Sequence, residues 1–298
     1  MPHEFSASAF IERNKNNTRP LFRWTVGPSP FGNKILFESC RTFSILYGDL
    51  ADGVAVFNSC FDHKTLEKFQ KELCKYNVDC IKADIDSLPL QPKHTGWKFY
   101  PPRLRMQSHE IFIDSDLVML ARGWHINNFL SSNKSFANKG VIADFGSHTK
   151  DIRDENIDFP PINAGIFGFP PKYDINKVLI EHIGWEDWFD EQGLTTRLVV
   201  MTEYQIIPDP VIYNYHNCDC GMVTTYFSKY PKEIYRIKER TDEMEGFHFI
   251  TGNQITENPA WIYYEKKPFG FVNKLHPPKE FKSFYWSTGI TANSIKLT

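Results

Sequence analysis

The stretch that decides the fold is His109-Glu110-Ile111-Phe112-Ile113-Asp114-Ser115-Asp116, a short apolar run that ends in two carboxylates. Its isoleucines and phenylalanine favour β structure, so the run predicts a buried strand. Residues i and i+2 of an extended chain point to the same face, so Asp114 and Asp116 would converge at the strand's carboxyl end, where open α/β sheets bind ligands. Neighbouring carboxylates repel each other unless a cation lies between them. The stretch therefore predicts a site for Mn²⁺ or Mg²⁺, with an ordinary surface turn as the alternative.

The sequence around this strand predicts an α/β fold with one large core. Residues 54–58 are apolar enough for a strand, Asp62 can cap a helix over residues 64–76, and residues 80–83 predict a second strand. Strand, helix and strand within about thirty residues predict a parallel βαβ unit with a right-handed crossover. Further strands are expected at 141–145 and 162–169, with a helix over about 175–189 and an apolar run at 198–201 that reads as a strand.

Composition excludes several classes of protein. The formal charge of −2 gives no overall attraction to nucleic acid or to acidic membranes. The polar N-terminus has no apolar core of a signal peptide, and no run of apolar residues is long enough to span a bilayer. The six cysteines are dispersed, as is typical of reduced thiols in a cytoplasmic protein, which is the location we expect.

Three other segments carry candidate functional residues. Asn163-Ala164-Gly165 would let a ligand approach the backbone, with the Asn163 amide as donor and acceptor; a tight strand bend is the alternative. Glu203, after the apolar run, could orient or activate a hydroxyl, or could be an acidic residue at a helix N-terminus. His248, between two phenylalanines, could be a third metal ligand or a core histidine.

The order of these segments resembles the retaining GT-A glycosyltransferases, especially family 8 with its galactosyl-, glucosyl- and glycogenin-type members. The similarity extends over roughly residues 20–262. It consists of the Asp-Ser-Asp strand end, the Asn-Ala-Gly segment, Glu203-Tyr204-Gln205 with Tyr213-Asn214-Tyr215, and His248-Phe249-Ile250-Thr251-Gly252. The resemblance implies a Rossmann-like mixed sheet flanked by helices and a catalytic domain over 1–262.

The resemblance also implies an activity and a set of ligands. Members transfer a hexosyl or pentosyl group from a nucleotide-sugar, usually a UDP-sugar, and hold Mn²⁺ through residues matching Asp114, Asp116 and His248. By position, Asn163 and Glu203 would lie at the donor sugar and the acceptor. Expected donor-binding residues are Thr25, Val26, Gly27, Arg103, Ser115, Ala164, Gly165, Gly252 and Lys266.

This sequence departs from the family pattern in three places, one of which is an extra residue between His248 and Gly252. The lysine of the family's last motif, which meets the diphosphate, has no counterpart after Gly252, so the metal, Arg103 or Lys266 would take its role. Glu203-Tyr204 stands where the family has Asp-Gln, which leaves inversion open, although retention is the expectation.

Residues 263–298 are expected to form a C-terminal extension. Five lysines, two glutamates and several aromatic residues lie between Trp261 and Trp286. Such a stretch can pack on the core, lie on a membrane surface or stack on nucleic acid. The acceptor therefore stays open among a glycan, a lipid-linked glycan, a protein and a modified DNA base. A sugar-phosphate nucleotidyltransferase and a non-enzymatic carbohydrate-binding protein are the alternative functions.

Overall fold

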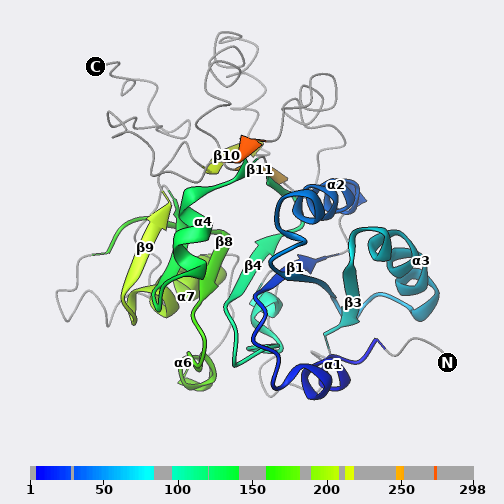
Figure 1. The fold of residues 1–298 in the computed structure, drawn as a ribbon, viewed down its shortest axis with the longest axis horizontal. Helices are drawn as coiled ribbons and strands as arrows, with labels where there is room; N and C mark the ends of the chain where they lie inside the picture. Colours follow the sequence, from blue (N-terminus) through cyan, green and yellow to red (C-terminus); the bar gives the residue numbers. More distant parts are fainter. Residues whose placement is uncertain are drawn as a thin grey trace, which may run out of the picture.

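A computed structural model of the chain describes residues 5–27, 30–83, 96–119, 121–140, 159–181, 189–207, 212–217, 246–251 and 272–273. Its centre is a seven-stranded mixed sheet in the order β3-β2-β1-β4-β8-β7-β9 (Figure 1). Helices flank the sheet, so the α/β mixed-sheet architecture expected from the sequence is confirmed.

The first half of the sheet is parallel and follows the predicted βαβ pattern. Its elements are β1 (Leu21–Val26), α2 (Pro30–Tyr47), β2 (Asp52–Phe57), α3 (His63–Leu73), the 3-10 turn η1 (Cys74–Tyr76) and β3 (Val78–Lys82). Asp62 caps α3 as predicted, because its Oδ1 accepts a hydrogen bond of 2.7 Å from the Thr65 amide.

The second half of the sheet is mixed because one strand, β8, is antiparallel to its two neighbours. Its elements are β4 (Glu110–Asp114), α4 (Trp124–Leu130), β7 (Ser135–Lys139), β8 (Ile162–Phe169), α6 (Asn176–Glu181), α7 (Phe189–Val200) and β9 (Tyr204–Ile207). Strand β8 lies antiparallel between β4 and β7, and all eight of its residues are buried.

Some predicted boundaries need correction. The strand expected at 141–145 lies outside the described residues, and the strand found nearby is β7. The helix expected over 175–189 includes α6, whereas 182–188 are not described. The apolar run at 198–201, read as a strand, is the end of α7 and the turn after it, because its apolar residues pack a helix onto β8.

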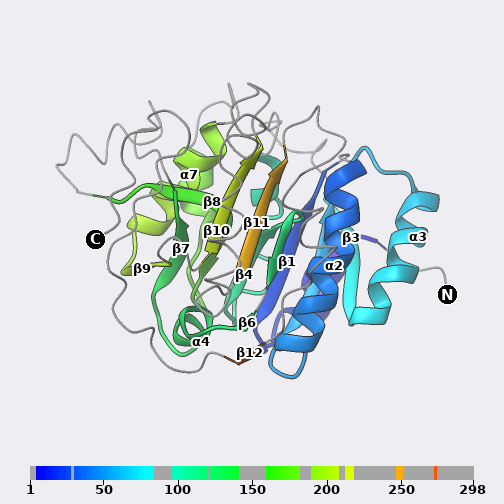
Figure 2. The ribbon, with the colours of Figure 1, turned by 90° about the horizontal axis from the view of Figure 1, so that it is seen from above.

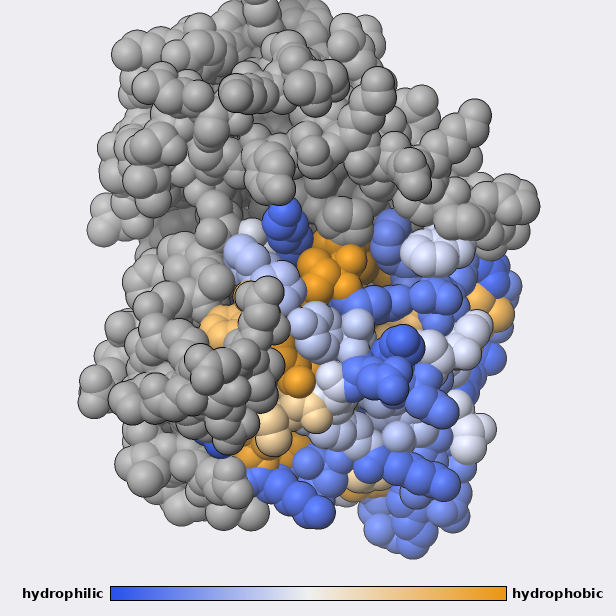
Figure 3. Space-filling view, turned by 90° about the vertical axis from the view of Figure 1, so that its left-hand side faces the viewer, coloured by the Kyte–Doolittle hydropathy of each residue, from blue (hydrophilic) through white to orange (hydrophobic). Residues whose placement is uncertain are grey.

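The sheet is covered on both faces. Helices α2, α3 and α4 pack on one face around Trp24, Ile111 and Ile113. On the other face, α6 and α7 pack around Phe112 and Phe167, and α1 (Ala7–Asn14) covers Leu21 and Val54 (Figure 2). The described surface visible in Figure 3 is mostly hydrophilic, as expected when the apolar residues of a sheet face helices on both sides.

Two small sheets adjoin the main one. Strand β5 (Leu117–Met119) pairs with β11 (Gly246–Thr251), which pairs with β10 (Ile212–Asn217). Strand β12 (Val272–Asn273), inside the predicted extension 263–298, pairs with β6 (Ala121–Arg122); the rest of the extension is not described. Among the described helices, none combines the length and the apolar character that a membrane crossing requires.

Candidate active site

The predicted carboxylate pair lies where the chain leaves the main sheet. Asp114 is the last residue of β4, and β5 begins at Leu117, so Asp114, Ser115 and Asp116 form the passage from one sheet to the next. All three residues are partly exposed, the Asp114 side chain by 28%. The expectation of a buried strand that ends in accessible carboxylates is thus met by the structure.

The predicted Asn163-Ala164-Gly165 segment lies beside this strand end. Ile113 and Ile166 are partners in the antiparallel β4–β8 pair, so the residues just before Ile166 lie next to the end of β4. The side chain of Asn163 is buried, and its Oδ1 accepts a hydrogen bond of 2.8 Å from the Gly165 amide. This contact shapes the start of β8 at the level of Asp114.

The end of β1 lies beside the end of β4, on the side opposite β8. Thr25 is the register partner of Asp114. The Val26 carbonyl accepts a hydrogen bond of 3.1 Å from the Asn58 amide, and a Cβ on Gly27 would meet nothing within 4 Å. Thr25, Val26 and Gly27 are therefore close to the carboxylates, with open space beyond the strand.

Lys98 joins these parts, and the sequence did not single it out. It lies in the 3-10 turn η2 (Gly96–Phe99) and is buried. Its Nζ donates to Asp114 Oδ1 at 2.7 Å and to the Ala164 carbonyl at 3.1 Å, and it forms an ion pair with Glu191. Burial lowers the pKa of Lys98, but the attraction of Asp114 and Glu191 outweighs it and raises this pKa above its usual value, so Lys98 is an ammonium.

Glu191 is the second residue that the sequence interpretation missed. It lies in the first turn of α7, where a carboxylate is favoured by the helix dipole, and only 6% of it is exposed. Two carboxylates, on Asp114 and Glu191, pair with this one ammonium, a formal charge of −1, and Asp116 follows two residues after Asp114. Hard oxygen ligands with this excess charge fit a divalent cation.

His248 reaches the same place through backbone pairing. It is the register partner of Leu117, the residue after Asp116, and on its other side it pairs with Asn214. Its side chain is not described, and neither are Gly252 and Lys266. Within the described side chains, no group of three or more histidine, cysteine or acidic residues is arranged to hold a metal ion. The metal role of His248 stays a prediction.

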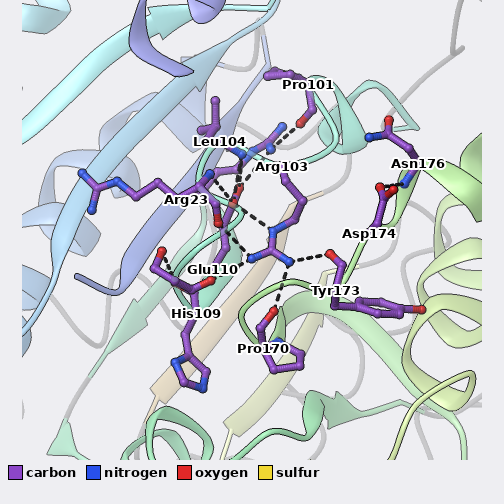
Figure 4. Close-up of polar contacts among 12 residues, drawn as sticks. Arg23, Pro101, Arg103, Leu104, His109, Glu110, Pro170, Tyr173, Asp174 and Asn176 are labelled. Carbon is purple, nitrogen blue, oxygen red and sulfur yellow. Dashed lines mark hydrogen bonds and ion pairs between the residues drawn. The ribbon is translucent and has the colours of Figure 1, made fainter. Parts of the chain in front are cut away.

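Arg103 lies at the other end of β4, which corrects the expectation that it contacts the donor. Its Nε pairs with Glu110 Oε2 at 3.2 Å, at the amino end of the strand (Figure 4). Its two terminal nitrogens donate to four backbone carbonyls, those of Arg105, Ser108, Pro170 and Tyr173. Every nitrogen of this buried guanidinium is thus used to hold the chain together.

Glu203 also lies away from the carboxylates. It precedes β9, and its neighbour Tyr204 pairs with Ser135 at the start of β7. This start lies level with the amino end of β4, because Phe136 pairs with Gly168 and Gly168 with Ile111. The side chain of Glu203 is 80% exposed, and its Oε2 lies 3.3 Å from Lys134 Nζ. The structure therefore does not bring Glu203 to Asn163, whereas Glu191 contacts Lys98, which in turn donates to the Ala164 carbonyl beside Asn163.

Comparisons with known proteins give distant similarities. No family model and no curated protein matches the chain. Among solved structures, the bifunctional glycosyltransferase WbbM matches 84% of this chain with 15% identity and a TM-score of 0.49; the chain covers 52% of WbbM, about half of its length. The galactosyltransferase LgtC, bound to donor and acceptor sugar analogues, matches 82% of this chain and 94% of its own, with 12% identity and a TM-score of 0.47.

Mouse xyloside xylosyltransferase 1 is similar over 80% of this chain and 99% of its own, with 12% identity and a TM-score of 0.42. The matched proteins are glycosyltransferases by description.

Proposed function

We propose that this chain is a metal-dependent glycosyltransferase of the GT-A type, similar to family 8. It would move a hexosyl or pentosyl group from a UDP-sugar to an acceptor hydroxyl with retention of configuration. The observation that carries the proposal is the convergence of Asp114, Asp116 and the Asn163–Gly165 segment at the carboxyl edge of β4. Open α/β sheets bind nucleotides at this edge.

Asp114 and Asp116, with His248, are the residues that would hold Mn²⁺ or Mg²⁺. The partly exposed carboxylates and the excess negative charge of Asp114 and Glu191 over Lys98 support this assignment. A bound divalent ion would supply neutralisation of the charge that develops on the departing diphosphate.

The chain's own residues would fix the geometry of transfer. The Lys98 ammonium ties Asp114 to Ala164, so the carboxylate and the start of β8 are held in one arrangement. We assign to Asn163 and Glu191 the surroundings of the donor sugar, with Glu191 in place of Glu203, because Glu191 contacts Lys98. Thr25, Val26 and Gly27 would line the nucleobase end.

In this proposal the bond between the sugar and the phosphate oxygen breaks as the acceptor oxygen bonds to the sugar, through an oxocarbenium-like state. The departing phosphate takes the proton of the acceptor hydroxyl, so no strong base is required. The acceptor classes named above, the cytoplasmic location and the role of 263–298 in acceptor, membrane or nucleic-acid contact remain predictions.

A thermal-shift panel tests the proposal. UDP, GDP, ADP and CDP are added with and without Mn²⁺, and UDP with Mn²⁺ is expected to give the largest rise in Tm. A protein that binds carbohydrate without catalysis would show no nucleotide-dependent rise. Pyrophosphate released from UTP and a sugar phosphate would instead indicate a nucleotidyltransferase.

The Asp116→Ala variant makes the test specific. It should abolish transfer and the Mn²⁺-dependent stabilisation by UDP while the ligand-free protein still folds, because Asp116 is partly exposed. Asp79→Ala, at an exposed position of β3, is the matched control and should behave like the wild type. Full transfer activity in Asp116→Ala would contradict the assignment.

A further inference from the structure

Arg23 lies in the middle of β1, and its side chain reaches the segment that carries Lys98. Its Nη2 donates to the carbonyls of Lys98 at 2.7 Å and Tyr100 at 2.9 Å. Its Nη1 donates to the Pro101 carbonyl at 2.6 Å (Figure 4). One guanidinium therefore donates hydrogen bonds to three carbonyls in and just after η2, the turn in which Lys98 lies.

The position of this guanidinium is itself fixed by two residues of β4. Glu110 Oε1 lies 3.3 Å from Arg23 Nη1, and the guanidinium lies 4.6 Å from the centroid of the Phe112 ring. Burial lowers the pKa of Arg23 to about 10, partly opposed by Glu110, so the side chain stays charged at neutral pH. Arg23 is fully buried between these contacts.

Stability alone does not explain an arginine at this place. Removing a charge from water is costly, and well-packed apolar residues in place of a buried ion pair are often neutral or stabilising. Among the residues that the structure describes, Arg23 Nε has no hydrogen-bond partner, which adds to this cost. What the guanidinium does provide is directional binding of one particular backbone segment.

Lys98 links Arg23 to the candidate active site. Its carbonyl is bound by Arg23, and its ammonium contacts Asp114 and the Ala164 carbonyl. We propose that Arg23 is a positioning residue of the active site, which sets the place of the Lys98 ammonium by binding the backbone of residues 98–101. The proposal rests on the glycosyltransferase function for its catalytic consequence, whereas the placement of Lys98 can be measured independently.

Arg103 offers a matched control. It is a second buried arginine on the same carboxylate, Glu110, and it also binds backbone carbonyls, but none of them belongs to 98–101. Arg23→Gln and Arg103→Gln are compared at a temperature at which both proteins remain folded. Because a displacement of about 1 Å in an active site can lower the rate about 100-fold, Arg23→Gln should lose about that factor in kcat. Arg103→Gln should stay near the wild-type kcat.

The independent readout is ¹⁵N NMR of lysine ammonium groups. The wild type should show one protected ammonium signal that is absent in Lys98→Met. This signal should shift or disappear in Arg23→Gln and persist in Arg103→Gln. If Arg23→Gln does not fold, Arg23→Lys replaces it, and the signal of the new lysine is identified in Arg23→Lys/Lys98→Met.

The outcomes separate the two proposals. An unchanged Lys98 signal in the Arg23 variant, or equal effects of the Arg23 and Arg103 variants, would overturn the positioning role. The expected NMR pattern in a protein that lacks transfer activity would instead remove the proposed function and leave the positioning of Lys98 standing.

Discussion

Replacing Lys98 by methionine tests the centre of the site, because it keeps the length of the side chain and removes its charge. Glu191, with 8% of its side chain exposed, would lose its ion-pair partner, and Asp114 would lose one contact. Breaking a buried ion pair costs about 3–5 kcal/mol. Asp114 is 28% exposed and can turn to solvent, so we expect a loss of about 3 kcal/mol of unfolding free energy.

Urea denaturation measures this loss. With a slope of about 3 kcal/mol/M, the midpoint should fall by about 1 M. The folded-state pKa of Lys98 lies above its ordinary 10.5, so its contribution is complete below pH 10.5 and is lost only as the pH rises through the folded-state value. The difference from wild type should therefore stay constant between about pH 6 and about pH 9.

A second substitution separates the cost of the unpaired Glu191 carboxylate from the cost of the lost packing. Glu191→Gln in the Lys98→Met background removes the uncompensated carboxylate and should recover part of the stability. A loss below about 1 kcal/mol in Lys98→Met, the value of an exposed ion pair, would refute the reasoning that this lysine is a buried structural cation.

Three further predictions follow from the structure. Burial lowers the pKa of His109, so stability is present above its ordinary 6.5 and lost as the pH falls; between about pH 7 and about pH 5 the urea midpoint should drop less in His109→Phe than in wild type. Gly140→Ala should cost about 1–3 kcal/mol, measured by the same urea titration, because a Cβ would lie 2.5 Å from the Ile162 backbone. Gly27→Ala should keep the wild-type Tm and weaken UDP binding, since its Cβ enters open space beside the strand ends.

Local signals predicted β2, β4 and the start of α3 well. The apolar runs at β2 and β4, and the Asp62 cap of α3, each depend on neighbours in sequence, so they could be recognised without the fold. The apolar run at 198–201 was misread because four apolar residues fit the end of a helix as well as a strand.

The candidate site was predicted only where its residues lie at the ends of strands. Asp114 and Asn163 belong to β4 and β8, which the sequence located. Lys98 and Glu191 meet through tertiary packing, and no spacing links them. The available signal was the run Trp97-Lys98-Phe99-Tyr100, in which a lysine stands among aromatic residues that are expected to be buried. The family resemblance predicts Arg103 at the donor, whereas in the structure its guanidinium binds Glu110, a partner that no sequence spacing indicates.

The pairing of β5 with β11 has a consequence for how the protein folds. Leu117 and His248 lie opposite each other, so this contact closes a loop of about 130 residues, whereas β1, β2 and β3 join through short crossovers. Loop closure costs conformational entropy before any contact compensates it, and distant pairings form slowly. We therefore expect the β1–β3 unit to acquire hydrogen-exchange protection early in refolding and the turn at Asp116 to acquire it last. The chemistry of the chain would then depend on the slowest step of its assembly.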